Sequence, residues 1–130
     1  MVEKRALIPE DRSLTLQEIE LVRWLLEHGT PGVAPAFLAQ VDQARVASRC
    51  PCGCASIDFA IAGRLPPVGA PLQILSDYWW ESDEGDKFGV FVFAKADLLA
   101  GLEVWSVDGR AVANSLPKIA SLKPIACRNT

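Results

Sequence analysis

The sequence has few of the residues that usually carry catalysis, since its 130 residues include one histidine and one tyrosine. It contains no G-x-S-x-G, G-x-G-x-x-G or Walker motif, so neither a nucleophile-elbow hydrolase nor a nucleotide-binding loop is predicted. The single histidine, His28, lies in the last turn of a predicted helix, where it interacts well with the helix dipole and needs no catalytic role. These absences favour a non-catalytic protein.

Concentrated positive charge and long apolar runs are also missing. The 13 basic and 16 acidic side chains give a formal net charge of -3, and the basic ones are scattered from Lys4 to Arg128. Nucleic acid requires clustered positive charge, so it is not an expected partner. No apolar run reaches membrane-spanning length and the N-terminus lacks the apolar stretch of a secretory signal. We therefore expect no membrane association and a cytoplasmic location.

What is present predicts a single α+β domain over residues 1–130. The segment "TLQEIELVRWLLEHG" has the pattern of an amphipathic helix, in which Thr15 caps the first turn and Glu18 closes a capping box. Gly29 ends this helix. A short second helix is predicted in "PAFLAQVDQ", because Pro35 is well tolerated in a first turn.

After the second helix the apolar period changes from helical to alternating, which predicts an antiparallel sheet of about five strands. We expect a hairpin, "ARVASRC" and "SIDFAIAG", then a three-stranded meander, "LQILSDYWWES", "KFGVFVFAK" and "LLAGLEVWSV". In "KFGVFVFAK", Phe88, Val90 and Val92 point to one face while Phe91 and Phe93 point to the other. Two small helices cannot cover both faces, so we expect the C-terminal tail, or failing that another molecule, to cover the second.

Three of the four cysteines, Cys50, Cys52 and Cys54, alternate along "RCPCGCAS" in the connection of the predicted hairpin. In the cytoplasm thiols stay reduced, which favours thiols or metal ligands over disulfides. Zinc sites usually use C-x₂₋₄-C spacing, but C-x-C pairs also bind soft metals. Zinc is therefore a candidate cofactor, with Cys127 or His28 as a fourth ligand.

Two other interpretations of the cysteine stretch stay open. Arg49 can lower the pKa of the neighbouring Cys50 thiol, which would suit a redox switch, although no C-x-x-C motif opens a helix here. Cysteine is also among the most buried residue types, so the three side chains can serve simply as small apolar ones.

An acidic and aromatic run, "SDYWWESDEGDK", is the other candidate site. Strand alternation places Asp77, Trp79 and Glu81 on one face, and aligned neighbours would add Asp58, Glu103 and Trp105. Aromatic side chains among charges are typical of protein-binding surfaces. The candidate partner-binding residues are Asp77, Trp79, Trp80, Glu81 and Trp105.

Such a surface would suit a basic protein partner, such as a toxin neutralised by its immunity protein, or self-association. The alternative is that the acidic residues form a solvated turn and one of the tryptophans belongs to the core.

The stretches "SRCPCGCASIDF", "SDYWWES" and "FAKADLLAGLEVWSVDG" together resemble a small bacterial protein family of unknown function. The resemblance covers residues 45–109 and depends on an R-C-x-C-G-C block and an L-E-V-[YW]-S-x-D-G block. It implies no activity, ligand or site residue.

Overall fold

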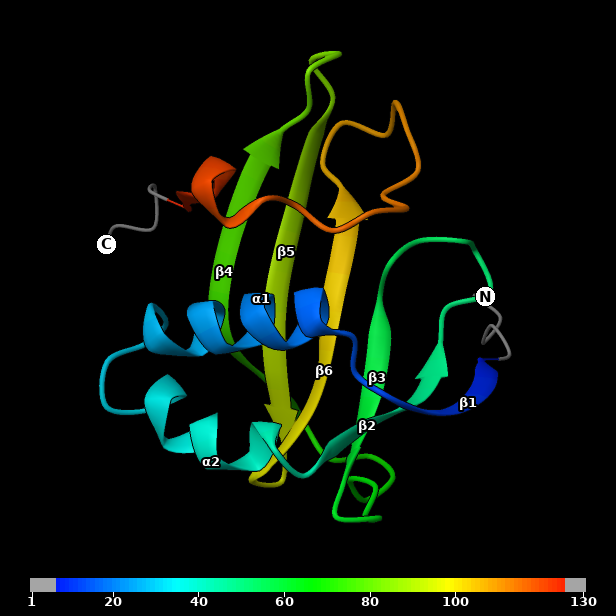
Figure 1. Cartoon of the computed structure of the whole chain (residues 1–130), viewed down its shortest axis with the longest axis vertical. Helices are drawn as coiled ribbons and strands as arrows, with labels where there is room; N and C mark the ends of the chain where they lie inside the picture. The colour runs from blue at the N-terminus through cyan, green and yellow to red at the C-terminus, as the bar shows by residue number, and fades with distance from the viewer. Residues whose placement is uncertain (1–6, 126–130) are drawn as a thin grey trace.

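The computed structural model describes residues 7–125, which form one antiparallel sheet with the helices on one of its faces (Figure 1). Seven strands pair in the order β1-β2-β3-β6-β5-β4-β7. The strands are β1 (Ile8–Ser13), β2 (Ala44–Arg49), β3 (Ile57–Ile61), β4 (Leu72–Glu81), β5 (Lys87–Lys95), β6 (Leu98–Ser106) and β7 (Lys123–Pro124). The helical segments are α1 (Leu16–Glu27), η1 (Ala34–Phe37), α2 (Leu38–Val41) and η2 (Ile119–Ser121). The predicted α+β class is confirmed.

Helix α1 begins with the predicted capping box. The Thr15 hydroxyl accepts a hydrogen bond of 3.1 Å from the Glu18 N–H, and the Glu18 carboxylate accepts one of 2.8 Å from the Thr15 N–H. These two bonds satisfy donors that a helix start otherwise leaves unpaired. The last turn closes when the His28 N–H donates to the Trp24 carbonyl. The predicted second helix is present as η1 followed by α2.

The predicted meander is formed by β4, β5 and β6, which pair in succession. A two-residue turn joins β5 to β6, and both of its residues, Ala96 and Asp97, have positive φ angles of 51° and 65°. Two positive φ values match a type I′ turn, whose twist suits the flanking strands. The predicted hairpin is formed by β2 and β3, with the cysteines in their connection.

The strand count is higher than the five expected, because two short strands join the edges of the sheet. β1 pairs with β2 just ahead of α1, where the charged sequence "IPEDRS" carries no apolar alternation. β7 pairs with β4 through two residue pairs, Tyr78–Pro124 and Trp79–Lys123. Such edge strands depend on a neighbouring strand more than on their own sequence pattern.

The core lies between the sheet and α1. Phe88, Val90 and Val92 of β5 point into it and are 8%, 0% and 0% exposed. The expectation that the C-terminal tail covers the opposite face is wrong for residues 107–125, the part of the tail that the structure describes. The chain after β6 crosses the face that α1 covers (Figure 1), and Leu116, Ile119 and Leu122 pack against the core there.

No helix within residues 7–125 is both long enough and apolar enough to cross a lipid bilayer.

Candidate functional site

The face of the sheet opposite α1 brings together most of the predicted partner-binding residues. Trp79 of β4 pairs with Gly89 of β5, and Gly89 pairs with Trp105 of β6. The next row along the sheet is Asp77, Phe91 and Glu103. Residues directly opposite one another in paired strands share a face. We call this surface the open face, and its residues are Ser48, Asp58, Asp77, Trp79, Gly89, Phe91, Phe93, Gly101, Glu103 and Trp105.

Trp105 is the most exposed aromatic side chain of this row. Its indole lies on Gly89, where an added Cβ atom would come within 2.5 Å of the ring. Glycine at that position therefore lets the ring lie flat on the sheet while 40% of Trp105 stays exposed. Trp79 is half-buried, since the Lys123 ammonium lies 4.9 Å from its ring centroid. This cation–π contact connects β7 to the open face.

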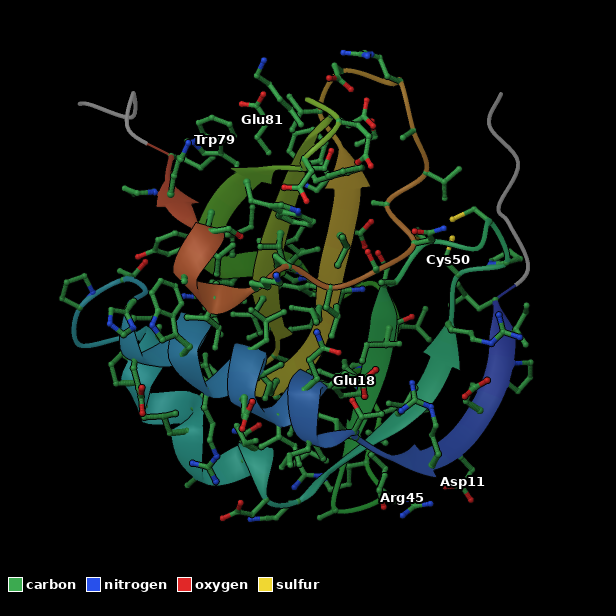
Figure 2. All side chains as sticks on the ribbon, turned by 45° about the horizontal axis from the view of Figure 1, so that its top comes forward. Asp11, Glu18, Arg45, Cys50, Trp79 and Glu81 are labelled. Carbon is green, nitrogen blue, oxygen red and sulfur yellow. The ribbon has the colours of Figure 1, made fainter. Side chains whose placement is uncertain are left out.

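Trp80 and Glu81 occupy different surroundings from Trp79. Trp80 is 7% exposed and packs against Phe88 in the core, with ring centroids 5.2 Å apart. Its proposed role in partner binding is therefore wrong, because a buried ring cannot anchor a partner. Glu81 is exposed beside Trp79 at the end of β4, across the molecule from Cys50 (Figure 2). The sequence alternation indicated that Trp79 and Trp80 face opposite ways, but not which of them faces inward.

Glu103 is the carboxylate of the open face with the most perturbed surroundings. Burial raises the pKa of Glu103 above its ordinary value of 4.5, a hydrogen bond with Ser56 opposes the shift, and the nearby Asp58 charge raises the pKa further. Asp58 in turn accepts a hydrogen bond of 3.0 Å from the Ser48 hydroxyl. Glu103 is thus a half-buried carboxylate, and the charged group that shifts its pKa is another acid, Asp58.

This pKa shift predicts how the Glu103→Gln variant responds to pH. An acid with a raised pKa in the folded state stabilises the fold below its unfolded pKa, and that contribution is lost as pH rises through the folded pKa. We therefore expect the free energy of unfolding to fall less steeply with pH in Glu103→Gln, from about pH 4.5 upward. Urea unfolding of both proteins between pH 4 and 7.5 measures the difference. Parallel profiles would contradict the assigned environment of Glu103.

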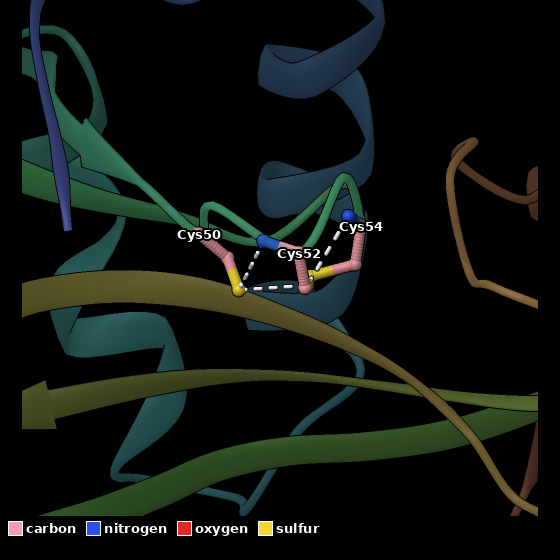
Figure 3. Close-up of side chains that lie close together, drawn as sticks. All are labelled: Cys50, Cys52 and Cys54. Atoms are coloured by element: carbon pink, nitrogen blue, oxygen red, sulfur yellow. Dashed lines mark hydrogen bonds between the residues drawn. The ribbon is translucent and has the colours of Figure 1, made fainter. Parts of the chain in front are cut away.

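The predicted cysteine group is also present, on the loop between β2 and β3. The Sγ atoms of Cys50, Cys52 and Cys54 all lie within 4.8 Å of one another (Figure 3). The closest pair, Cys50 and Cys52, is 2.7 Å apart, and the backbone N–H groups of Cys52 and Cys54 point at the sulfurs of Cys50 and Cys52. Three thiols this close can hold a metal ion.

Contacts with distant parts of the chain hold this loop in place. The Ser56 hydroxyl accepts a hydrogen bond from the Val104 N–H and donates one to the Val104 carbonyl. The Ala55 N–H donates to the Ala113 carbonyl at 2.8 Å. β3 and β6 pair only through Ile57–Leu102 and Asp58–Gly101, so these bonds replace strand pairing beyond that point. The end of the loop that precedes β3 is thereby held beside the end of β6.

Burial raises the pKa of the Cys50 thiol to about 11, and its hydrogen bond with Cys52 acts in the same direction. Cys50 is therefore protonated at neutral pH. A metal bound through this sulfur displaces the proton, so metal affinity increases with pH. The lowered pKa of Cys50 suggested by the adjacent Arg49 is not found, and Arg49 instead pairs with Glu10 at 2.8 Å.

The cysteine group and the open face border one cavity. Its volume is about 340 Å³, and its lining includes all three cysteines together with Glu103, Trp105 and Val112. This neighbourhood was missed from the sequence, because Cys54 lies in the β2–β3 loop, Glu103 lies in β6, and no local pattern connects them.

Of the two residues suggested as a fourth metal ligand, His28 does not join the group. His28 stacks on Trp24, with ring centroids 4.1 Å apart, and its Nδ1 lies 2.8 Å from the Trp24 carbonyl. Cys127 lies outside the described residues. Among residues 7–125 the ligand group contains only Cys50, Cys52 and Cys54.

Comparison with protein-family models, curated proteins and solved structures found no match to this chain. The resemblance to a bacterial family accordingly stays a prediction. The chemistry of the two candidate sites has to be inferred from their own residues.

Proposed function

We propose that this protein is a non-catalytic, cytoplasmic interaction module that binds a basic protein through the open face. One observation carries the proposal: the paired rows around Gly89 and Phe91 bring Trp79, Phe91 and Trp105 together on the face opposite α1, where Trp105 stays 40% exposed. Neighbouring aromatic side chains that stay partly exposed are costly in water and are typical of surfaces that are buried on binding.

Charge on the open face favours a basic partner. Phe91 lies between Asp77 and Glu103 in the register, and Asp58 lies close enough to raise the pKa of Glu103. An arginine or lysine from a partner would pair with the Glu103 carboxylate and offset the cost of burying its charge. The lysines of this face, Lys95 and Lys123, lie over the rings of Phe93 and Trp79 at its margins. A toxin neutralised by its immunity protein is one pair with this chemistry.

A photo-crosslinking amino acid at position 81, at the margin of the open face, tests this proposal in cells. We expect a covalent adduct with a basic protein, whereas the same group at exposed position 11 of β1 gives none. The double variant Asp77→Lys, Glu103→Lys should reduce the adduct roughly tenfold or more, because like charges then face the partner. The double variant Asp83→Lys, Glu84→Lys, an equal charge change in the exposed β4–β5 turn, should leave it unchanged.

Two outcomes would overturn the proposal. One is an adduct of equal yield from positions 81 and 11, or one that survives the double charge reversal. The other is an adduct only with a second copy of this chain, which would make the open face a self-association surface.

A second candidate function is favoured by the convergence of Cys50, Cys52 and Cys54. It is metal binding by this group, zinc included, or reversible thiol oxidation. The metal content of protein purified without chelator tests it, compared with a variant in which all three cysteines are serine. Equal metal content and equal redox response in the two proteins would exclude it.

A further inference from the structure

The geometry points to a more specific ion for the cysteine group: Cys50, Cys52 and Cys54 form a three-coordinate site for one monovalent copper ion, Cu(I). This inference deepens the metal-binding candidate above and depends on it. The distances between the sulfurs, the number of ligands and the surroundings of the loop support Cu(I).

The sulfur positions require little movement to hold one ion. At a metal–sulfur distance of about 2.3 Å, three sulfurs in a trigonal arrangement around one ion lie about 4.0 Å apart. The three Sγ atoms already lie within 4.8 Å of one another, and Cys50 and Cys52 have to separate from 2.7 Å. The loop can adjust, because Gly53 has a positive φ of 90° and nothing packs within 4 Å of its Cβ position.

The number of ligands favours Cu(I) over zinc. Structural zinc is almost always bound by four ligands in a tetrahedron, usually from C-x₂₋₄-C clips. The described part of the chain brings three thiols together and adds no histidine or carboxylate to the group. Cu(I) is a soft ion that selects thiolates, and three of them complete its coordination.

The surroundings also suit a monovalent copper ion. The cavity beside the sulfurs is lined largely by apolar groups, which include Trp105, Val112 and Ala113. An apolar lining limits the access of water and oxidants to a bound metal. Cys52 lies on the exposed side of the loop, so an ion can enter without opening the core.

Competition titrations of the reduced, full-length protein under anaerobic conditions test the inference. Cu(I) and Zn²⁺ are titrated separately against a chromophoric chelator for each ion, and native mass spectrometry counts the ions bound. We expect one Cu(I) per chain, and zinc held at least a thousandfold more weakly, because residues 7–125 offer it three ligands rather than four. Cys52→Ser should weaken Cu(I) binding roughly a hundredfold, because one of three ligands is removed.

Cys127→Ser is the matched control, since it removes the cysteine that lies beyond the described residues, and a site completed by three thiols should keep its Cu(I) binding unchanged. Circular dichroism of each variant confirms that the fold is retained. Zinc bound more tightly than Cu(I), and lost in Cys127→Ser, would overturn the copper assignment in favour of a four-cysteine zinc site. Failure to bind either ion would overturn both the copper assignment and the metal-binding candidate.

Discussion

Replacing Phe59 by alanine is expected to lower the free energy of unfolding by about 3–5 kcal/mol. Phe59 of β3 is 0% exposed and lies opposite Val46 of β2, on the face of the sheet that α1 covers. Truncation there removes a buried ring and leaves a cavity that the packed core cannot fill. Since small domains are stable by about 5–15 kcal/mol, this loss would be a large share of the total.

Phe91→Ala provides the matched comparison, because it removes the same atoms from the opposite face. Phe91 is half-buried on the open face, so we expect it to cost only about 1–2 kcal/mol. Urea unfolding of the two variants measures both effects. Equal losses would contradict an open face, since they would mean that Phe91 is as fully enclosed as Phe59.

Glu18→Ala is expected to cost about 2–3 kcal/mol, because one carboxylate serves both the helix cap and an ion pair. Glu18 is 7% exposed and accepts from the Thr15 N–H and from Arg12 of β1. The two Arg12 bonds, of 3.0 Å and 3.1 Å, form a fork that joins the first strand to the first helix. The hydrogen bonds with Glu18 are also the main reason that the pKa of Arg12 is raised.

Glu18→Gln separates the two roles, since a glutamine keeps an acceptor for the Thr15 N–H but loses the charge. We expect about half the effect of Glu18→Ala, measured by thermal and urea unfolding. If Glu18→Ala costs less than about 0.5 kcal/mol, the capping box and the Arg12 pair contribute little to stability.

The local parts of the fold could be predicted because their signals lie within a few residues of one another. The Thr15–Glu18 capping box spans one helical turn, and the meander strands alternate with a period of two. The same alternation correctly grouped Asp77, Trp79 and Trp105 on one face once the strands paired in register. The position of the cysteines in the β2–β3 connection followed from the strands on either side.

The candidate sites were predicted in part. The alternation separated Trp79 from Trp80, but burial of Trp80 depends on Phe88, which lies across the β4–β5 hairpin. The close grouping of the three sulfurs requires the loop to be held by Val104 and Ala113, both distant in sequence. None of these contacts can be predicted from the local pattern of apolar and polar residues.

The sequence by itself determined the helix start, the hairpin and the meander, because local hydrogen bonds and side-chain period specify these elements. Only the tertiary structure decided which face of the sheet is covered. The segment after β6 crosses the α1 face and leaves Trp105 40% exposed on the other. The side-chain period of a strand predicts which residues share a face, but burial depends on where distant segments pack. The cavity between the cysteines and Glu103 also depends on tertiary packing, because its lining comes from separate segments of the chain.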